Sequence, residues 1–342
     1  MILFTFFTKL LHFLPGELSH SIALRGLKAL HSLGLLPLLV RKQKTNHDGL
    51  TVTNLHKLKG LSNNLGIAAG LDKNAEYVDC INALGVGFIE VGTVTPKPQS
   101  GNPKPRIFRN RKEKYLINRL GFNNEGVDRL VENLKKRKSS SPIGISIGKN
   151  FDTPNHKASD DYLVCLEKVY AYANYIAINI SSPNTKDLRD LTNKVYLDSL
   201  LKELKSKQSD LSERFGYKPL FIKVSPDEDL VRLGEICDVI LDNKIDGIIC
   251  SNTTIEHNDK NGIGGLSGAP LKMKATERLL FIRDKVGIDF PLIASGGIMS
   301  VLDYKERITA GADFVQVYTG FIFEGPKLIN DILLTKENSR NA

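Results

Sequence analysis

Polar side chains that could do chemistry follow several short apolar runs of the sequence. Amides, hydroxyls and lysines predominate in this set, and Asp72 is its only carboxylate. Glycoside hydrolysis by two carboxylates and hydrolysis by two metals both need acidic residues, so the set argues against both. It favours binding of an anionic organic ligand. The set consists of Asp72, Lys73, Thr93, Asn150, Asn179, 181–185, Lys223, 251–254, 295–297, Tyr318 and Thr319.

The apolar runs themselves predict the strands of a parallel sheet. Each run is followed by a glycine or polar cluster and then by a helical pattern, which is typical of a parallel sheet covered on both faces. Eight such units fit a (β/α)8 TIM barrel of about 250 residues better than a doubly wound sheet, which usually has fewer strands. The runs are 65–70, 88–93, 143–148, 175–181, 220–225, 247–252, 291–297 and 314–320.

In such a barrel the active site forms at the carboxyl ends of the strands, so the polar set is expected to meet there. The segments 296–297 and 318–320 follow the last two runs, where these barrels usually bind phosphate through backbone amides. A phosphate there and a Lys223 ammonium at the mouth suit flavin mononucleotide (FMN), whose reduced ring is anionic. The alternatives are glycines that only turn the chain, an ion-paired Lys223, and a local salt bridge between Lys73 and Asp72.

Two segments interrupt the repeating pattern. The longest gap between runs contains Pro96, Pro98, Pro103 and Pro105, followed by the basic stretch 109–114, and it predicts an inserted hairpin or lid around residues 94–125. The glycine cluster 262–268 is a weak dinucleotide motif, because no predicted strand leads directly into it. Both segments are therefore expected outside the barrel strands.

The net charge of +9 is concentrated near the start of the 342-residue chain. Residues 1–44 contain six lysines and arginines against Glu17 alone, among many apolar residues. An anionic membrane surface attracts such a segment by roughly 1 kcal/mol per basic residue. A nucleic-acid footprint and a purely solubilising surplus are the alternatives.

The first 40 residues predict an amphipathic helical hairpin that lies in a membrane interface. Their longest uncharged run is shorter than the roughly 20 residues that span a bilayer, and no secretory cleavage pattern follows, so we expect the segment to be retained. Pro15–Gly16 divides it into two short helices. A helix pair packed on the barrel is the alternative. We therefore expect a hairpin at 1–44, a barrel at 45–342, and a linker at 41–48.

The cysteines and histidines indicate neither a disulfide framework nor a metal site. The four cysteines lie far apart without a CxxC pair, and the seven histidines form no HxxxH or HExxH pair. We therefore expect a reducing compartment and no bound metal.

Eight motifs follow one another between residues 68 and 321. They are AAGLDK (68–73), EVGTVTPKPQSGNPKPRIFR (90–109), INRLGFNNEG (117–126), NISSPNT (179–185), SNTT (251–254), GGLSG (264–268), SGGI (295–298) and YTGF (318–321). Each motif alone is a weak signal, but the ordered set, which covers about three quarters of the chain, resembles the quinone-dependent (class 2) dihydroorotate dehydrogenases. Members of that family are FMN barrels that oxidise (S)-dihydroorotate to orotate in pyrimidine (UMP) synthesis and pass the electrons to a membrane quinone.

The resemblance implies FMN as cofactor, dihydroorotate and orotate as substrate and product, a membrane quinone as acceptor, and neither nucleic acid nor metal. It implies that FMN is bound by Ala69, Gly70, Lys73, Thr93, Asn179, Lys223, Ser251, Gly268, Gly297, Tyr318 and Thr319. It implies that the substrate is held by Lys73, Asn118, Arg119, Leu120, Gly121, Phe122, Asn179, Asn184, Asn252 and Thr253.

Ser182 stands where the family places its catalytic base, which removes the C5 proton while hydride leaves C6 for flavin N5. An unaided serine hydroxyl is a poor base, so Thr185 and Phe122 are expected to shape a proton path beside it. Class 1 relatives have cysteine at this place, and the serine therefore favours class 2.

One residue departs from the family pattern. The family usually has asparagine in the strand 143–148 where this chain has Ser146, and serine lacks the amide donor. FMN contact by Ser146 is therefore one expectation, and contact by Asn150 is the alternative.

The N-terminal hairpin resembles the extension that forms the quinone entrance of class 2 enzymes. His20 and Arg109 match positions that line this tunnel. The resemblance thus implies a peripheral protein on the cytoplasmic side of a cell inner membrane.

Two other functions are compatible with parts of the pattern. An FMN barrel reductase that acts on uracil in tRNA would explain the basic charge, but no RNA-binding domain is evident after residue 320. A membrane-tethered barrel that holds FMN as a structural or sensing ligand agrees less well with the amide-rich strand ends and Ser182.

Overall fold

The computed structural model describes residues 2–36, 61–185, 188–260 and 262–338. The predicted linker at 41–48, and with it the boundary between the hairpin and the barrel, lies outside these residues.

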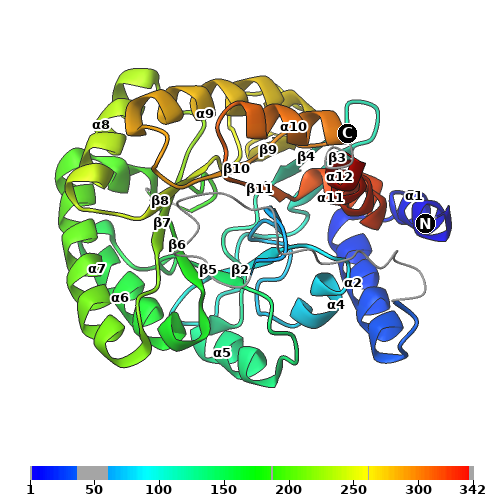
Figure 1. Ribbon diagram of the computed structural model, residues 1–342, viewed down its shortest axis with the longest axis horizontal. Helices are drawn as coiled ribbons and strands as arrows, with labels where there is room; N and C mark the ends of the chain where they lie inside the picture. Colours follow the sequence, from blue (N-terminus) through cyan, green and yellow to red (C-terminus); the bar gives the residue numbers. More distant parts are fainter. Residues whose placement is uncertain (1, 37–60, 186–187, 261, 339–342) are drawn as a thin grey trace.

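Eight parallel strands close into the predicted barrel (Figure 1). Neighbouring strands pair in the order β1, β11, β10, β8, β7, β6, β5 and β2. Seven of the strands lie within one of the eight apolar runs, and β2 extends one residue beyond its run, so the prediction of a (β/α)8 barrel is confirmed. The strands are β1 (Leu65–Ile67), β2 (Phe88–Val94), β5 (Ile143–Ile147), β6 (Tyr175–Asn179), β7 (Leu220–Val224), β8 (Gly247–Cys250), β10 (Leu292–Ser295) and β11 (Phe314–Val317).

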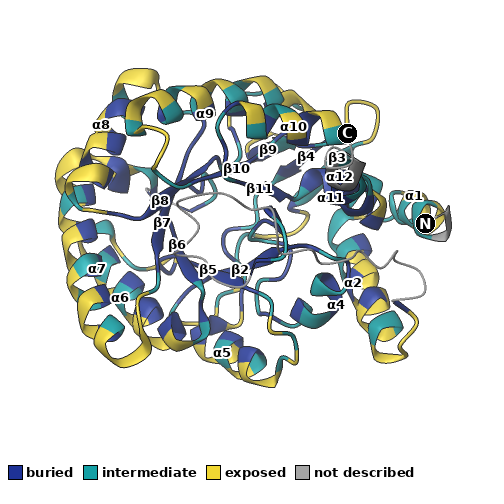
Figure 2. Cartoon of the chain, in the orientation of Figure 1, coloured by how far each residue is buried: buried dark blue, intermediate teal, exposed yellow. Residues whose placement is uncertain are grey.

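Helices surround the barrel, and most of them turn an exposed face outward (Figure 2). Side-chain caps mark some of their starts, as where Asp229 accepts from the backbone N–H of Arg232 at 2.8 Å. The helices are α4 (Val78–Asn82), α5 (Gly126–Lys136), α6 (Ala158–Val169), α7 (Lys194–Phe215), α8 (Leu230–Asp242), α9 (Lys272–Val286), α10 (Val301–Thr309), α11 (Thr319–Glu324) and α12 (Pro326–Asn338). Short 3₁₀ helices are η2 (Asn155–Lys157), η3 (Tyr170–Tyr172), η4 (Leu188–Thr192) and η5 (Ala269–Leu271).

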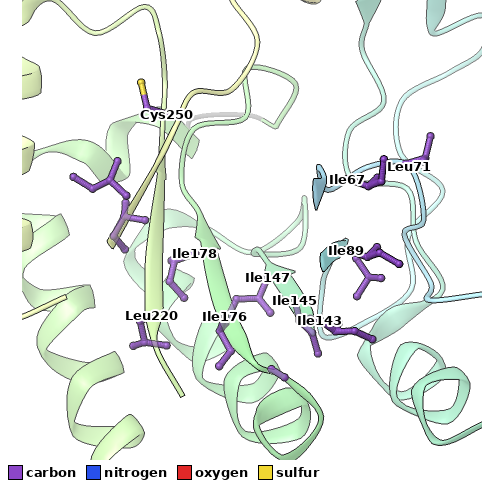
Figure 3. Packing of buried hydrophobic residues seen from close by; sticks show 14 of the residues in the cluster. Ile67, Leu71, Ile89, Ile143, Ile145, Ile147, Ile176, Ile178, Leu220 and Cys250 are labelled. Atoms are coloured by element: carbon purple, nitrogen blue, oxygen red, sulfur yellow. The ribbon is translucent and has the colours of Figure 1, made fainter. Parts of the chain in front are cut away.

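The strands bury side chains on both faces. Ile143, Ile145 and Ile147 alternate along β5 and belong to the large core between strands and helices (Figure 3). Each such side chain contributes about 1.5–3 kcal/mol by burial. Because both faces are buried, the strands read as continuous apolar runs, which made them visible in the sequence.

Aromatic side chains fill the inside of the barrel below its mouth. Phe88, Tyr175 and Phe221 pack edge to face, with ring centroids 6.2 and 5.3 Å apart along the series. A Cβ at Gly144 would collide with the Tyr175 ring, so the glycine makes room for it. The lower barrel is therefore a packed layer, and only the upper end can receive a ligand.

A small antiparallel sheet covers the mouth of the barrel. Its strands are β3 (Ile107–Asn110), β4 (Tyr115–Asn118) and β9 (Gly265–Gly268), paired in that order. The first two form the hairpin predicted within residues 94–125. The third comes from the glycine cluster after β8, which the sequence pattern did not predict as a strand.

Two helices, α1 (Ile2–Leu11) and α2 (Gly16–Ser32), form the N-terminal hairpin beside the barrel (Figure 1). They meet at Pro15–Gly16, as predicted. The Glu17 carboxylate accepts from Nε and Nη2 of Arg106 at 3.0 and 3.1 Å, which ties α2 to the lid. Among the described residues, no helix is both long and apolar enough to cross a membrane.

Candidate active site

The polar residues predicted at the strand ends do meet in one central cavity. It opens at the carboxyl ends of the barrel strands, under the lid, and has an empty volume of about 940 Å³. Every residue predicted to bind FMN or substrate lines it, with the exceptions of Ser146 and Arg119. The predicted ligand-binding or catalytic side chains in its lining include Lys73, Asn118, Phe122, Asn179, Ser182, Asn184, Lys223, Asn252 and Thr253.

The amides of this cavity are held by one another. Nδ2 of Asn184 donates to Oδ1 of Asn118 at 3.1 Å, and Nδ2 of Asn252 donates to Ser181 Oγ at 3.0 Å. Nδ2 of Asn179 donates to Thr93 Oγ1 at 2.8 Å. Because these bonds fix the orientations of the amides, the site is preorganised for a polar ligand.

Ser182 lies in the loop after β6 and faces the cavity with only 6% of its surface exposed. Its Oγ accepts from the backbone N–H of Asn184 at 3.3 Å. Thr185 is also buried, and its Oγ1 has no hydrogen-bond partner among the described residues. The loop therefore presents one hydroxyl to the cavity and holds a second, unused hydroxyl close by in the chain.

Lys73 does not pair with Asp72. The Asp72 carboxylate instead accepts from the backbone N–H groups of Glu76 and Tyr77 at 2.9 and 2.7 Å, and burial raises its pKa to about 6. Nζ of Lys73 donates to Oδ1 of Asn123 in the lid loop. Burial, with a smaller contribution from Arg106, lowers the pKa of Lys73 to about 7. The Lys73 ammonium lines the cavity and donates to a neutral amide oxygen, an arrangement that suits the binding of an anion.

Lys223 both lines the cavity and forms an ion pair. Its side chain rises from β7 and is 7% exposed, and its Nζ lies 3.9 Å from Oε1 of Glu90 on β2. The two interpretations of Lys223 considered from the sequence, ligand contact and ion pair, are therefore compatible.

Close-packed glycines form the end of the cavity after β10 and β11. A Cβ at Gly297 would collide with the backbone of Lys272, and the Gly297 φ of +72° disfavours any side chain. Arg307, which is buried, donates from Nη2 to the carbonyl oxygens of Gly296 and Lys272 at 3.0 and 2.9 Å. The Arg307 guanidinium thus lies behind the Gly296–Gly297 loop, and a ligand in the cavity can come close to the backbone of this loop.

Three expectations about individual residues are corrected by the structure. Arg119 does not line the cavity, because its guanidinium instead donates to the Pro105 carbonyl and lies over the Phe108 ring. Ser146 is fully buried beneath the lining, with its Oγ 2.8 Å from Thr93 Oγ1. The amide of Asn150 holds lid residues instead, including the carbonyl of Lys97 at 2.9 Å.

A second cavity lies between the hairpin and the barrel. Its described lining is mostly apolar, with an empty volume of about 2280 Å³, and it shares Asn118, Ser267 and Tyr318 with the central cavity. Helices α1 and α2 form one wall, and α11 and the lid form the other. The two cavities therefore adjoin at these shared side chains.

The two predicted tunnel residues both line the second cavity. Nε2 of His20 lies 2.8 Å from the carbonyl oxygen of Leu71, and burial lowers the His20 pKa. Arg109 donates from Nη1 to the His12 carbonyl at 3.1 Å and from Nη2 to Ser19 Oγ at 2.7 Å. Its buried Nε has no partner among the described residues. Arg109 thus fixes the end of α1 and keeps one spare donor.

Sequence reasoning missed several lining residues. Gln316 and Ser267 line the central cavity, and Glu90 lies directly beneath it. Glu90 and Gln316 are polar residues in otherwise apolar buried strands, which is the signal that could have identified them. Within the described part of the chain, no group of three or more His, Cys, Asp or Glu side chains could hold a metal ion.

The fold and the two cavities define a TIM-barrel enzyme with a preorganised polar site and an adjoining apolar one. Residues 51–337 match the family model for dihydroorotate dehydrogenase. The chain is 47% identical to the dihydroorotate dehydrogenase (quinone) of Aliivibrio salmonicida, over 94% of this chain and 96% of that protein. It is 46% identical to the protein of the same name from Vibrio atlanticus, with the same coverage.

A solved structure gives the same result. The fold superposes on the crystal structure of DHODH from Eimeria tenella in complex with ferulenol with a TM-score of 0.83 and 37% sequence identity. The superposition covers 95% of this chain and 92% of that chain. The chain therefore belongs to the quinone-dependent dihydroorotate dehydrogenases and is an oxidoreductase that acts on CH–CH bonds.

Proposed function

We propose that this protein oxidises (S)-dihydroorotate to orotate in UMP synthesis, with FMN as redox cofactor and a membrane quinone as electron acceptor. The observation that carries the proposal is the pair of adjoining cavities, one polar and one apolar, that share Asn118, Ser267 and Tyr318. In such a pair, a polar substrate and an apolar electron acceptor can each bind in a cavity of matching polarity, and electrons can pass between the two adjoining cavities.

The residues present fit FMN. The glycine loop at Gly296–Gly297 and the side chain of Thr319 would hold the phosphate. A Cβ at Gly268 or Gly297 would collide with neighbouring protein backbone, so both glycines let the loops that line the cavity pack closely. Lys223 would stand beside the ring, whose negative charge on reduction it would stabilise. When bound, FMN supplies the hydride acceptor for the reaction.

The amide network and Lys73 would hold the substrate. Dihydroorotate carries a carboxylate for Lys73 and ring amide groups for the side chains of Asn118, Asn184 and Asn252. The Ser182 hydroxyl would remove the C5 proton, and the unpartnered Oγ1 of Thr185 would help to carry that proton away from the site. Phe122, which also lines the cavity, would keep bulk water from this step.

The second cavity would receive the quinone from a membrane. The hairpin exposes large apolar side chains, including Phe13 at 73% and Leu33 at 71%, which suit insertion among lipid tails. The spare Nε donor of Arg109 and the His20 ring would bind the polar head of the quinone. We therefore propose residues 1–44 as a peripheral anchor on the cytoplasmic side of an inner membrane, and residues 45–342 as the FMN barrel.

A turnover assay tests the proposal. Purified protein loaded with FMN is mixed with dihydroorotate and a quinone in detergent, and orotate is followed by its ultraviolet absorption. Orotate that forms with quinone, but not when NAD⁺ replaces it, is the expected result. Failure to form orotate with any acceptor would contradict it.

Replacing Gly297 with alanine is expected to reduce FMN content about tenfold or more. The added methyl collides with the Lys272 backbone and forces the loop out of the position that a phosphate needs. The ratio of flavin to protein absorbance after purification measures the effect. Gly287→Ala is the control, because Gly287 also has a positive φ of +78° but no atom within 4 Å of the added Cβ. The control carries only the strain of about 1 kcal/mol and should keep its flavin.

Substrate affinity is expected to fall as pH rises through about 7. The buried Lys73 ammonium, whose pKa is lowered to about 7, is charged below that pH and neutral above it, so a carboxylate loses its partner at higher pH. The kcat/KM for dihydroorotate should drop by up to about tenfold per pH unit above the pKa. Lys73→Arg, which stays charged, should remove this inflection. A wild-type profile that is flat from pH 6 to pH 9 would refute the assignment.

A further inference from the structure

The barrel interior contains a carboxylate that the proposed chemistry does not use. Glu90 projects inward from β2 and is completely buried, one layer below the central cavity. Its Oε2 accepts from the Tyr175 hydroxyl and from Nε2 of Gln316, both at 2.8 Å. Two neutral donors on one oxygen leave much of the cost of burying a carboxylate uncompensated, so a cation is expected nearby.

That cation is Lys223. Oε1 of Glu90 accepts no hydrogen bond from any residue that the structure describes, and the Lys223 Nζ lies 3.9 Å from it. Across the described ranges, no other cationic side chain comes within ion-pair distance of Glu90. Lys223 also lines the central cavity, so its ammonium lies between a buried carboxylate and the ligand site.

The surroundings of Glu90 hold it in place. Tyr175, which donates to it, is packed between Phe88 and Phe221 in the aromatic layer. Nε2 of Gln316 also donates to the Tyr175 hydroxyl at 3.0 Å, which closes a three-residue network. Burial, and then the Glu90 charge, raise the pKa of Tyr175, so the hydroxyl keeps the proton that it donates. The carboxylate therefore has one fixed position from which to act on Lys223.

We propose that Glu90 is a positioning residue that fixes the Lys223 ammonium at the floor of the FMN cavity and lowers the flavin reduction potential through it. This inference rests on the proposed FMN site. An ammonium near the flavin ring favours reduction, and a carboxylate beside the ammonium offsets part of that effect. A purely structural role would leave the potential unchanged.

The test measures the two-electron midpoint potential of bound FMN in the wild type and in Glu90→Gln. Glutamine is nearly isosteric and keeps an acceptor for Tyr175, but it removes the negative charge. The equilibrium constant for reduction should increase about tenfold, which is a positive shift of about 30 mV for a two-electron couple. Glu90→Asp, which keeps the charge but draws it back from Lys223, should give a smaller positive shift and serves if the glutamine variant does not fold.

Two further variants separate positioning from general electrostatics. Tyr175→Phe keeps the carboxylate, Lys223 and the Gln316 donor that still holds Oε2 of Glu90, so its potential should stay near that of the wild type. In a Lys223→Met background, Glu90 has no ammonium through which to act on the flavin, so adding Glu90→Gln should shift the potential far less than it does when Lys223 is present. Equal potentials in wild type and Glu90→Gln, or an equal shift with and without Lys223, would overturn the inference. A protein that binds no FMN under any condition would instead overturn the proposed function.

Discussion

Ser182→Ala is expected to slow flavin reduction by dihydroorotate at neutral pH by about 100-fold or more, while FMN stays bound. A positioned general base typically contributes about 10²–10⁴-fold, and alanine removes the hydroxyl that the loop after β6 presents to the cavity to accept the C5 proton. Ser182 lines the cavity and is nearly buried, so water replaces its hydroxyl poorly. Stopped-flow absorption under anaerobic conditions measures the rate, and the visible flavin spectrum before mixing measures FMN content.

A matched serine serves as control for this variant. Ser225 directly follows the neighbouring strand β7, is also buried, and does not line the central cavity. In the Ser225→Ala variant, dihydroorotate should therefore reduce the flavin at a rate within a few-fold of the wild-type rate. If Ser182→Ala reduced flavin as fast as Ser225→Ala, Ser182 would have no place in the mechanism.

Deleting residues 1–40 is expected to separate the two halves of the reaction. The central cavity is lined by residues from 68 to 320, so flavin reduction by substrate should persist. The second cavity loses α1 and α2, which form one of its walls, and with them the apolar surface that would bury a quinone. Turnover with a long-chain quinone should fall by about tenfold or more, and binding to anionic vesicles should be lost.

The deletion also removes a contact to the lid, which needs its own control. Glu17 forms an ion pair with the buried Arg106, and Arg106 donates to the lid carbonyls of Ser100 and Asn102 at 2.6 and 3.0 Å. Glu17→Gln in the full chain weakens this pair but keeps the second cavity, so quinone turnover should be largely retained. Unchanged quinone turnover and vesicle binding in the deleted protein would refute the role of the hairpin.

The barrel and most of its site could be predicted from sequence because both depend on local patterns. Strands buried on both faces, such as Ile143–Ile147, are apolar at most positions, and the ligand groups of a parallel barrel follow the strands. Pro15–Gly16 likewise separates the two helices of the N-terminal hairpin through local backbone restrictions.

Features that depend on tertiary pairing could not be predicted in this way. The strand Gly265–Gly268 has two glycines and little β propensity, and it exists because it pairs with Tyr115–Asn118 in the lid. Arg119 follows Asn118 directly, and which of the two faces the cavity is decided by the register of that same sheet.

The buried charges were also beyond sequence reasoning. Glu90 and Lys223 lie more than a hundred residues apart, and their pairing follows from the closure of the barrel. Similarly, the adjacency of Asp72 and Lys73 suggested a salt bridge, but the Asp72 carboxylate caps backbone amides while Lys73 reaches the lid. Adjacent residues on an irregular loop seldom face each other, so only the fold shows the true partners.

The most direct test of the central claim is anaerobic addition of dihydroorotate to the purified, FMN-loaded protein, followed by addition of a quinone. The visible absorption of the flavin should bleach with substrate and return with quinone, because the polar cavity serves the first step and the adjoining apolar cavity the second. A flavin that stays oxidised in excess dihydroorotate would contradict the account and leave only an FMN-binding barrel.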